Sequence, residues 1–245
     1  MVKTDLDAKR AAVRQKNDLP SAASDISDFL AKAKQLKPDP QSEGRLIFAL
    51  DATMSRQPTW DQACHIQGEM FQEADKIGGL KIKLVYFRGF GECRASRWFE
   101  QGQDLARAMG RITCQGGRTQ IRKVLSAAIT AADREKIAAV VYVGDCMEEN
   151  VDELCDKAGQ LGMLGVPMFL FQEGRDQVAE RAFRELARLT KGAFCRFDAG
   201  SAQQLAELLK AVAVFASGGQ KALKELEQSG GQGARLLLEQ LKPHR

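Results

Sequence analysis

The 245-residue sequence has no apolar run long enough to cross a membrane, since a transmembrane helix needs about 20 such residues. Its first residues, MVKTDLDAKRAAVRQK, are charged throughout and lack the apolar centre of a signal peptide. We therefore expect a cytoplasmic protein with no membrane partner.

The sequence also lacks a basic block. Its net charge of +4 comes from 36 basic and 32 acidic residues that are scattered along the chain. Proteins that grip phosphate backbones concentrate Lys and Arg in one segment or on one face. The scatter therefore argues against nucleic acid as a partner.

Nitrogen and sulfur ligands for metals are scarce. The only histidines are His65 and His244, and the six cysteines include no C-x-x-C pair. Structural zinc sites and disulfide frameworks need several such residues at close spacing. We expect the cysteines to be small thiols, buried or half-buried in the fold.

Apolar strands and amphipathic helices alternate from residue 44 to residue 217. The expected strands are RLIFALD, KIKLVYFRGF, IAAVVYVGD, VPMFLFQ and AFCRFD, and the expected helices lie at 59–77, 103–112, 121–134, 150–164, 176–190 and 202–216. Strands rich in Val, Ile, Leu and Phe without polar alternation are buried on both faces. The shorter, more polar ECRASRWFE fits an antiparallel edge strand. The pattern predicts an α/β fold with a doubly wound, mostly parallel six-stranded sheet, one antiparallel edge strand and helices on both faces.

Two further segments flank this predicted domain. Residues 1–43 form an N-terminal arm, with a short helix at 24–36 and the linker KPDPQSEG. Residues 218–245 form a tail punctuated by glycine, with one apolar cluster at 236–238 and Leu241. Both a docked helix and an exposed peptide remain open for this cluster.

Oxygen-bearing side chains gather where the predicted strands end. Asp51, Thr53 and Ser55 follow the first strand, Asp145 closes the strand IAAVVYVGD, and Thr119 follows a Gly-Gly loop. In an open α/β sheet, ligands bind outside the carboxyl ends of the strands. Two carboxylates neutralise a divalent cation, and hydroxyls add dipoles without further charge. The set therefore predicts a site for a hard cation, Mg²⁺ first and Mn²⁺ next.

The spacing D-x-T-x-S, with a distant Thr and a distant Asp, resembles the metal-ion-dependent adhesion site (MIDAS) of von Willebrand factor A (vWA) domains, whose signature is D-x-S-x-S. The element order over residues 45–216 is similar as well. Thr53 departs from the usual Ser but retains the oxygen needed to coordinate. The resemblance implies that Thr53, Ser55 and, in the ligand-competent arrangement, Thr119 bind the cation directly. It also implies that Asp51 and Asp145 act mainly through bound water, and that a Glu or Asp of a partner fills the sixth position.

Other residues near these segments have simpler expected roles. Gly116 and Gly117 would let the Thr119 loop close over the site. Glu148 and Glu149 either add acid to the site or favour the dipole at the start of a helix, and the second role fits the motif D-C-M-E-E-N better.

Two enzyme classes with similar sheets fit these residues less well. Phosphatases with an aspartate nucleophile need D-x-D, because the second Asp is the general acid, and Thr53 stands in its place. Dehydrogenases need G-x-G-x-x-G, which does not follow the first strand.

The sequence thus predicts a non-catalytic module that engages a partner protein's carboxylate through Mg²⁺. The resemblance suggests bacterial vWA proteins that act beside ATPases or chaperone-like assemblies. A metal-dependent hydrolase of the phosphatase or esterase type and a metal-free scaffold, whose hydroxyls cap helices, remain alternatives.

Overall fold

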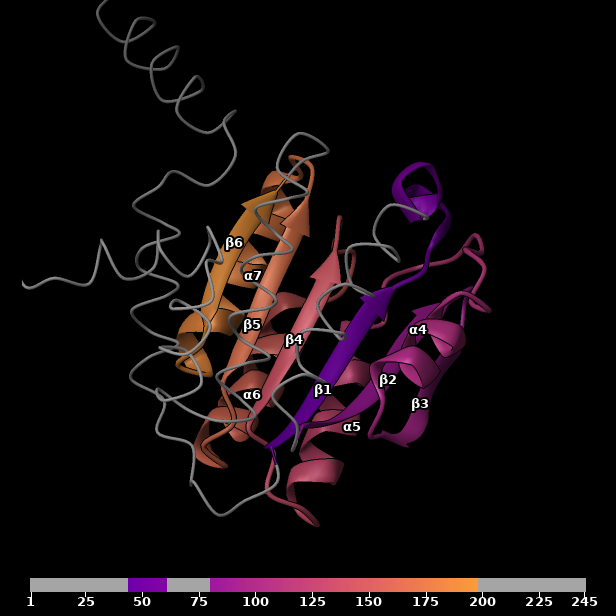
Figure 1. The fold of residues 1–245 in the computed structure, drawn as a ribbon. Helices are drawn as coiled ribbons and strands as arrows, with labels where there is room; N and C mark the ends of the chain where they lie inside the picture. Colours follow the sequence, from indigo (N-terminus) through magenta and orange to yellow (C-terminus); the bar gives the residue numbers. More distant parts are fainter. Residues whose placement is uncertain (1–43, 61–79, 198–245) are drawn as a thin grey trace, which may run out of the picture.

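The computed structural model describes residues 44–60 and 80–197. Within them, a six-stranded sheet has the order β3-β2-β1-β4-β5-β6 (Figure 1). The strands are β1 (Gly44–Asp51), β2 (Leu80–Arg88), β3 (Glu92–Phe99), β4 (Ala139–Gly144), β5 (Met168–Glu173) and β6 (Ala193–Phe197). All neighbours pair in parallel except β3, which is antiparallel to β2. The predicted sheet with its antiparallel edge strand is confirmed.

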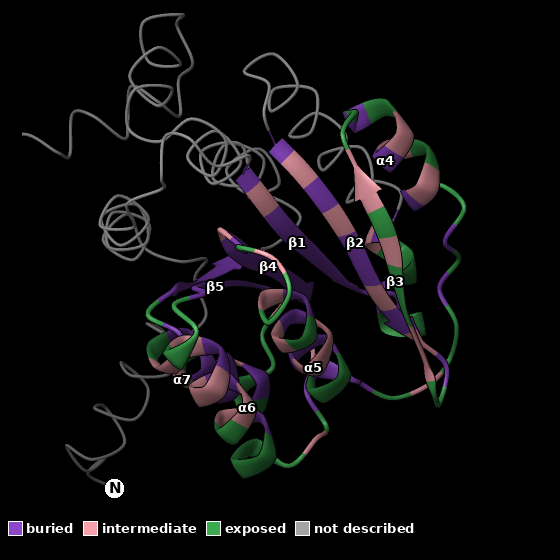
Figure 2. Ribbon diagram, turned by 90° about the horizontal axis from the view of Figure 1, so that it is seen from below, coloured by how far each residue is buried: buried purple, intermediate pink, exposed green. Residues whose placement is uncertain are grey.

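Helices flank this sheet. They are the 3-10 helix η1 (Met54–Thr59) and the α-helices α4 (Gly102–Met109), α5 (Ile121–Ala132), α6 (Val151–Met163) and α7 (Gln177–Leu189). Figure 2 shows α5, α6 and α7 side by side along one face of the sheet, and α4 lies near the edge strand β3. None of the helices in the described ranges is long and apolar enough to span a membrane.

Several expectations fall outside the described residues. They concern the arm at 1–43, most of the helix at 59–77, the helix at 202–216 and the tail at 218–245. The other expected helices and strands are present, with ends that differ from the predicted ones by a few residues.

The core forms because the central strands are apolar on both faces. Ile47 and Ala49 of β1 face a cluster that includes Val124 and Leu125 of α5, Leu154 of α6 and Phe183 of α7. Leu46, Phe48 and Leu50, which alternate with them, are equally buried. Each such side chain contributes about 1.5–3 kcal/mol when it leaves water. The continuous apolar run of β1 therefore fixes this strand in the middle of the sheet.

The sheet order places the end of β1 at a switch point. The chain leaves β1 towards β2 on one side, whereas β4 pairs with β1 on the other. In open α/β sheets, ligands bind outside the carboxyl ends of the strands at such a switch point. Asp51 ends β1, and Asp145 directly follows β4.

Candidate metal site

The segment after β1 forms a tight turn in which hydrogen bonds connect Asp51, Thr53 and Ser55. The Thr53 backbone N–H donates to Asp51 Oδ1 at 2.8 Å, the pattern of an Asx-turn. The hydroxyl oxygens of Thr53 and Ser55 lie 3.1 Å apart and share a hydrogen bond. Asp51 and Thr53 are buried, whereas Ser55 is exposed. The predicted D-x-T-x-S group is therefore a single structural unit, buried at one end and open at the other.

The structure brings the carboxylates of Asp51 and Asp145 together. Ligand atoms of Asp51, Asp145 and Cys146 all lie within 4.8 Å of one another. Asp51 Oδ2 and Asp145 Oδ1 are buried, and neither has a hydrogen-bond partner in the described part of the chain. Buried carboxylate oxygens normally have a partner, because losing water without one is costly. A shared proton or a cation would supply what these two oxygens lack.

Burial dominates the electrostatics of Asp51. The pKa of Asp51 is raised from 3.8 to about 7: burial is the largest cause and the charge of Asp145 acts in the same direction, while hydrogen bonds from Thr53 and the charge of Arg56 oppose the rise. Without a metal, Asp51 is therefore partly protonated near neutral pH. A divalent cation has to displace that proton.

Cys146 was not predicted to belong to this group. Burial, followed by the negative charges of Asp145 and Asp51, raises the pKa of the Cys146 thiol to about 12. The thiol is thus neutral and adds no charge to the site. The atoms of this group that can carry charge near neutral pH are therefore carboxylate oxygens, which are the kind of ligand that a hard cation prefers.

The loop that carries Thr119 runs beside the Asp51 turn. The Gln115 N–H donates to Ala52 O at 3.0 Å, and Thr53 and Gln115 form an isolated parallel bridge. A Cβ on Gly117 would lie 1.9 Å from Gly89 O, so only glycine permits this approach, whereas a Cβ on Gly116 would meet nothing within 4 Å. Of the two glycines, Gly117 is thus the one that lets the Thr119 loop pack against Gly89 in the turn between β2 and β3.

Hydrogen bonds tie the Thr119 loop to the loop that follows β4. Thr119 Oγ1 accepts from the Glu148 N–H at 3.0 Å, and the Thr119 N–H donates to Glu148 Oε2 at 3.3 Å. A hydroxyl has two lone pairs, so Thr119 Oγ1 retains one for a cation. The role of Thr119 as a ligand stays a prediction.

Glu149 has a structural role in the same two loops. Its carboxylate accepts from the backbone N–H groups of Ile121 at 2.5 Å and Arg122 at 3.0 Å. It therefore caps α5, which receives no cap from the side chain of Gln120. The motif D-C-M-E-E-N predicted a helix-dipole role at the helix that follows it, α6. The structure instead places Glu149 at the start of α5, and the side chain of Asn150 caps α6.

Arg56 is the charged residue that sequence reasoning missed. It stands one residue after Ser55, yet its side chain is 0% exposed and forms an ion pair with Glu173. Thr59 Oγ1 donates to the same carboxylate at 3.0 Å. Burial lowers the pKa of Arg56, and the charges of Asp145 and Asp51 oppose that change. An arginine in a polar turn is normally expected at the surface, so the sequence carries no signal for this burial.

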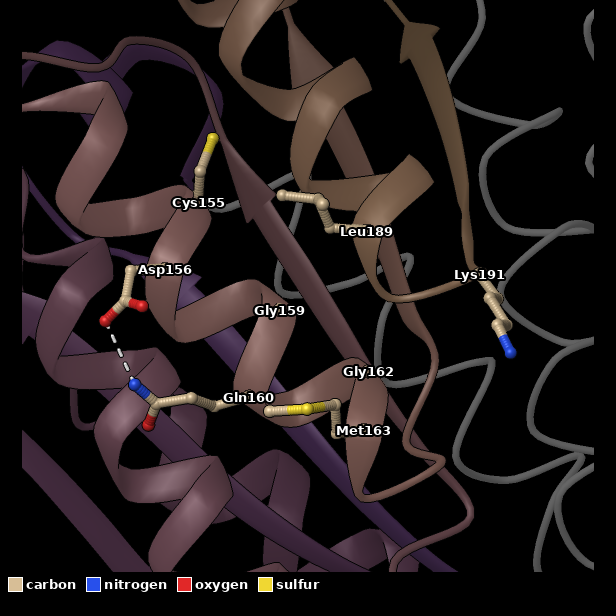
Figure 3. A pocket seen from close by; sticks show the side chains of 8 residues that line it. All are labelled: Cys155, Asp156, Gly159, Gln160, Gly162, Met163, Leu189 and Lys191. Atoms are coloured by element: carbon tan, nitrogen blue, oxygen red, sulfur yellow. Dashed lines mark hydrogen bonds between the residues drawn. The ribbon is translucent and has the colours of Figure 1, made fainter.

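A concave region is lined by other residues than these. It has a volume of about 540 Å³ and is lined by residues of α6 and the segment that ends α7, namely Cys155, Asp156, Gly159, Gln160, Gly162, Met163, Leu189 and Lys191 (Figure 3). Asp156 already accepts a hydrogen bond from Gln160 at 3.0 Å. No predicted site residue lines this region, so the candidate site is the group at the ends of β1 and β4.

Comparison with known proteins supports the fold. No family model matches the sequence, and no curated protein matches it. Several solved structures match the fold. "von Willebrand factor type A from Catenulispora acidiphila" is 17% identical, with a TM-score of 0.58 over 71% of this chain and 43% of that one. Proximal thread matrix protein 1 from the mussel byssus, with a zinc-occupied MIDAS motif, is 16% identical, with a TM-score of 0.59 over 71% and 47%.

A third structure matches almost over its full length. It is an aerotolerance-related membrane protein from Bacteroides fragilis, 14% identical, with a TM-score of 0.55 over 69% of this chain and 98% of that one. This chain thus spans under half the length of the first two structures and nearly all of the third. At such identities the likeness shows the fold alone. The fold is that of a vWA domain.

Proposed function

We propose that this chain is a non-catalytic protein-interaction module, in which a divalent cation bridges the domain to a carboxylate of a partner. Asp51, Thr53, Ser55, Thr119 and Asp145 would hold the cation, Mg²⁺ or Mn²⁺. The observation that carries this proposal is the pair of buried oxygens, Asp51 Oδ2 and Asp145 Oδ1, that have no partner among the described residues. Two acids this close together, whose charge Arg56 offsets only in part, favour a cation between them.

The donor set supports an ion that remains open to one more ligand. Two carboxylates neutralise a divalent cation, and the hydroxyls of Thr53 and Ser55 add no charge. Mg²⁺ prefers six oxygen ligands and keeps positions for water or an outside group. Because Ser55 is exposed, a ligand beside it is reached from outside the domain. An Asp or Glu of a partner protein has the charge and the oxygen that this position favours.

The comparisons support the same class of function. The mussel protein carries zinc in the corresponding kind of motif, which supports a divalent cation in a site on this fold. A bacterial, cytoplasmic assembly with an ATPase or chaperone-like partner is the setting that we propose.

Hydrolysis is less well supported than binding. A hydrolase would need a general base beside the cation. Glu148 and Glu149 are the further acids on the loop after Asp145, and both accept hydrogen bonds from the backbone of residues 119–122. Their carboxylates hold two loops together, which favours a rigid binding site.

Thermal unfolding of the full chain with and without Mg²⁺ tests the cation. A ligand that binds only the native state raises the free energy of unfolding, by about 2.7 kcal/mol when its concentration is 100 times its Kd. The melting temperature rises accordingly. We expect this rise in the wild type and in Asp152→Ala, which removes an exposed acid of α6, but not in Asp145→Ala. An equal rise in Asp145→Ala would refute the site.

Affinity capture tests the partner. We expect wild-type protein in Mg²⁺ to retain a protein that is lost with EDTA and with Asp145→Ala. A screen of generic phosphatase and esterase substrates with Mg²⁺ tests the alternative. Turnover that disappears in Thr119→Ala would replace the binding module with a hydrolase.

A further inference from the structure

Arg56 introduces a positive charge where the proposed site would take a cation. We propose that Arg56 is a built-in counter-charge of this site and that Glu173, by offsetting it, sets the affinity for the divalent ion. This inference rests on the proposed function. Neither residue is assigned as a ligand, because each acts through its charge on Asp51 and Asp145.

Because Arg56 is buried, its charge acts strongly on the acids that lie near it. Its side chain is fully enclosed, and arginine keeps its proton in proteins. A buried guanidinium is stable only beside anions. The described residues provide Glu173 as its ion-pair partner. Glu173 follows Gln172, which pairs with Gly144, the residue before Asp145, so the ion pair lies at the end of the sheet that carries Asp145. The charges of Asp51 and Asp145 also attract Arg56. In a low-dielectric interior these attractions are much stronger than at the surface.

Glu173 is well placed to offset Arg56. It ends β5, the strand next to β4, and its side chain is 14% exposed. The hydroxyl of Thr59, on the same turn as Arg56, donates to Glu173 Oε2 at 3.0 Å. Strands β1, β4 and β5 thus each deliver one acid to this end of the sheet. Glu173 thus pairs with Arg56 and Thr59, and Asp51 and Asp145 remain for the ion.

The balance of charge then matches a divalent cation. Three carboxylates and one guanidinium leave two net negative charges when all are ionised. One Mg²⁺ or Mn²⁺ neutralises the group. Loss of the Glu173 charge would leave a positive excess after the ion binds, and loss of the Arg56 charge would leave a negative excess. The two changes should therefore move the affinity in opposite directions.

A direct titration of the full chain with Mn²⁺ tests this inference. The electron paramagnetic resonance signal of free Mn²⁺ reports binding independently of stability. The measurement is made at pH 8.5, where Asp51, with its pKa of about 7, is ionised. We expect Arg56→Met to bind Mn²⁺ tighter by about tenfold, and Glu173→Gln to bind it more weakly by about tenfold. The double variant should return close to the wild-type affinity, and Arg56→Lys, which retains the charge, should stay near it.

A second ion pair supplies the matched control. Arg196 of β6 lies 3.5 Å from Glu180 of α7, with side chains 8% and 19% exposed. Strands β4 and β5 separate β6 from β1, so Arg196 lies farther than Glu173 from the strand that ends in Asp51. Arg196→Met should therefore lower stability without changing the affinity for Mn²⁺.

The outcomes separate the inference from the proposed function. If Arg56→Met and Glu173→Gln weaken Mn²⁺ binding alike, the pair is only structural and the inference is overturned. If Arg56→Met does not fold, the Mn²⁺ affinity of Glu173→Gln decides the test. Binding by Glu173→Gln that equals or exceeds that of the wild type overturns the inference. If neither the wild type nor Arg56→Met binds Mn²⁺, the cation site fails and the inference fails with it. Binding by Arg56→Met alone would support the counter-charge while refuting a cation site in the wild type.

Discussion

Replacing Asp51 with Asn should make the metal-free protein more stable at pH 8. Asn has the same shape and retains an oxygen that can accept from the Thr53 N–H, which now donates to Asp51 at 2.8 Å. It removes the negative charge that burial disfavours. A substitution at the centre of a binding site would then stabilise the domain while abolishing its response to Mg²⁺.

The magnitude follows from the pKa of Asp51. Burial raises that pKa from 3.8 to about 7, and each unit corresponds to about 1.4 kcal/mol, so ionising native Asp51 costs about 4 kcal/mol. Asn also removes a charge that attracts Arg56, which reduces the gain. We expect Asp51→Asn to raise the free energy of unfolding at pH 8 by about 1–4 kcal/mol, or several degrees in melting temperature.

The sign of the pH dependence is opposite to that of most acids. Because the folded-state pKa of Asp51 is raised, the native state holds this proton more tightly than the unfolded chain does. The stabilising contribution is complete below about pH 4, and it is lost as the pH rises from about 4 to about 7. The wild type should therefore lose stability relative to Asp51→Asn across that window.

Urea unfolding in EDTA at pH 4.5, 6 and 8 measures this difference. Subtracting the Asp51→Asn values from those of the wild type removes the effect of groups that the two proteins share. The reasoning is refuted if the variant is less stable than the wild type at pH 8, or if the difference does not change with pH. Saturating Mg²⁺ should raise the stability of the wild type and leave the variant unchanged.

Three further pairs of substitutions examine the loops around the site. Gly117→Ala should lower stability by about 1–3 kcal/mol and weaken Mn²⁺ binding, because its Cβ would lie 1.9 Å from a carbonyl oxygen, while Gly116→Ala should leave both unchanged in the same denaturation and titration experiments. Glu149→Ala should lower the free energy of unfolding by about 1 kcal/mol through loss of the α5 cap, whereas Glu153→Ala, at an exposed ion pair, should change it by under about 0.5 kcal/mol in urea unfolding. Thr119→Val should lose Mn²⁺ binding, as followed by the free-ion signal, and Thr119→Ser should retain it; equal binding by the two would exclude the hydroxyl as a ligand.

The fold was predictable because the polarity pattern of each strand indicates whether the strand is buried on both faces or lies at an edge. The run from Leu46 to Leu50 has no polar residue, so it could only be a strand buried on both faces, and the structure places β1 between β2 and β4. The mixed polarity of β3 indicated an edge, where water reaches one side. These are local properties, and a short window of sequence contains them.

The site was predictable only in part, for a related reason. Parallel strands that neighbour one another end at the same edge, which is why a motif after β1 and an acid after β4 point to one place. The roles of the side chains around them depend on contacts between segments that lie far apart in the chain. Glu149 caps a helix that begins at Ile121, and Gly117 is required because Gly89 of another loop lies against it.

The sequence by itself thus determined the alternation of strands and helices and the place of the oxygen-bearing residues at the strand ends, because hydrophobic period and turn composition are encoded locally. The tertiary structure alone decided which charges are buried together. Arg56 is enclosed beside Glu173, which lies far along the chain at the end of β5, and Cys146 lies near Asp51 because β4 pairs with β1. Burial and charge compensation are properties of the assembled surroundings, so the same residues in an isolated turn would be exposed to water.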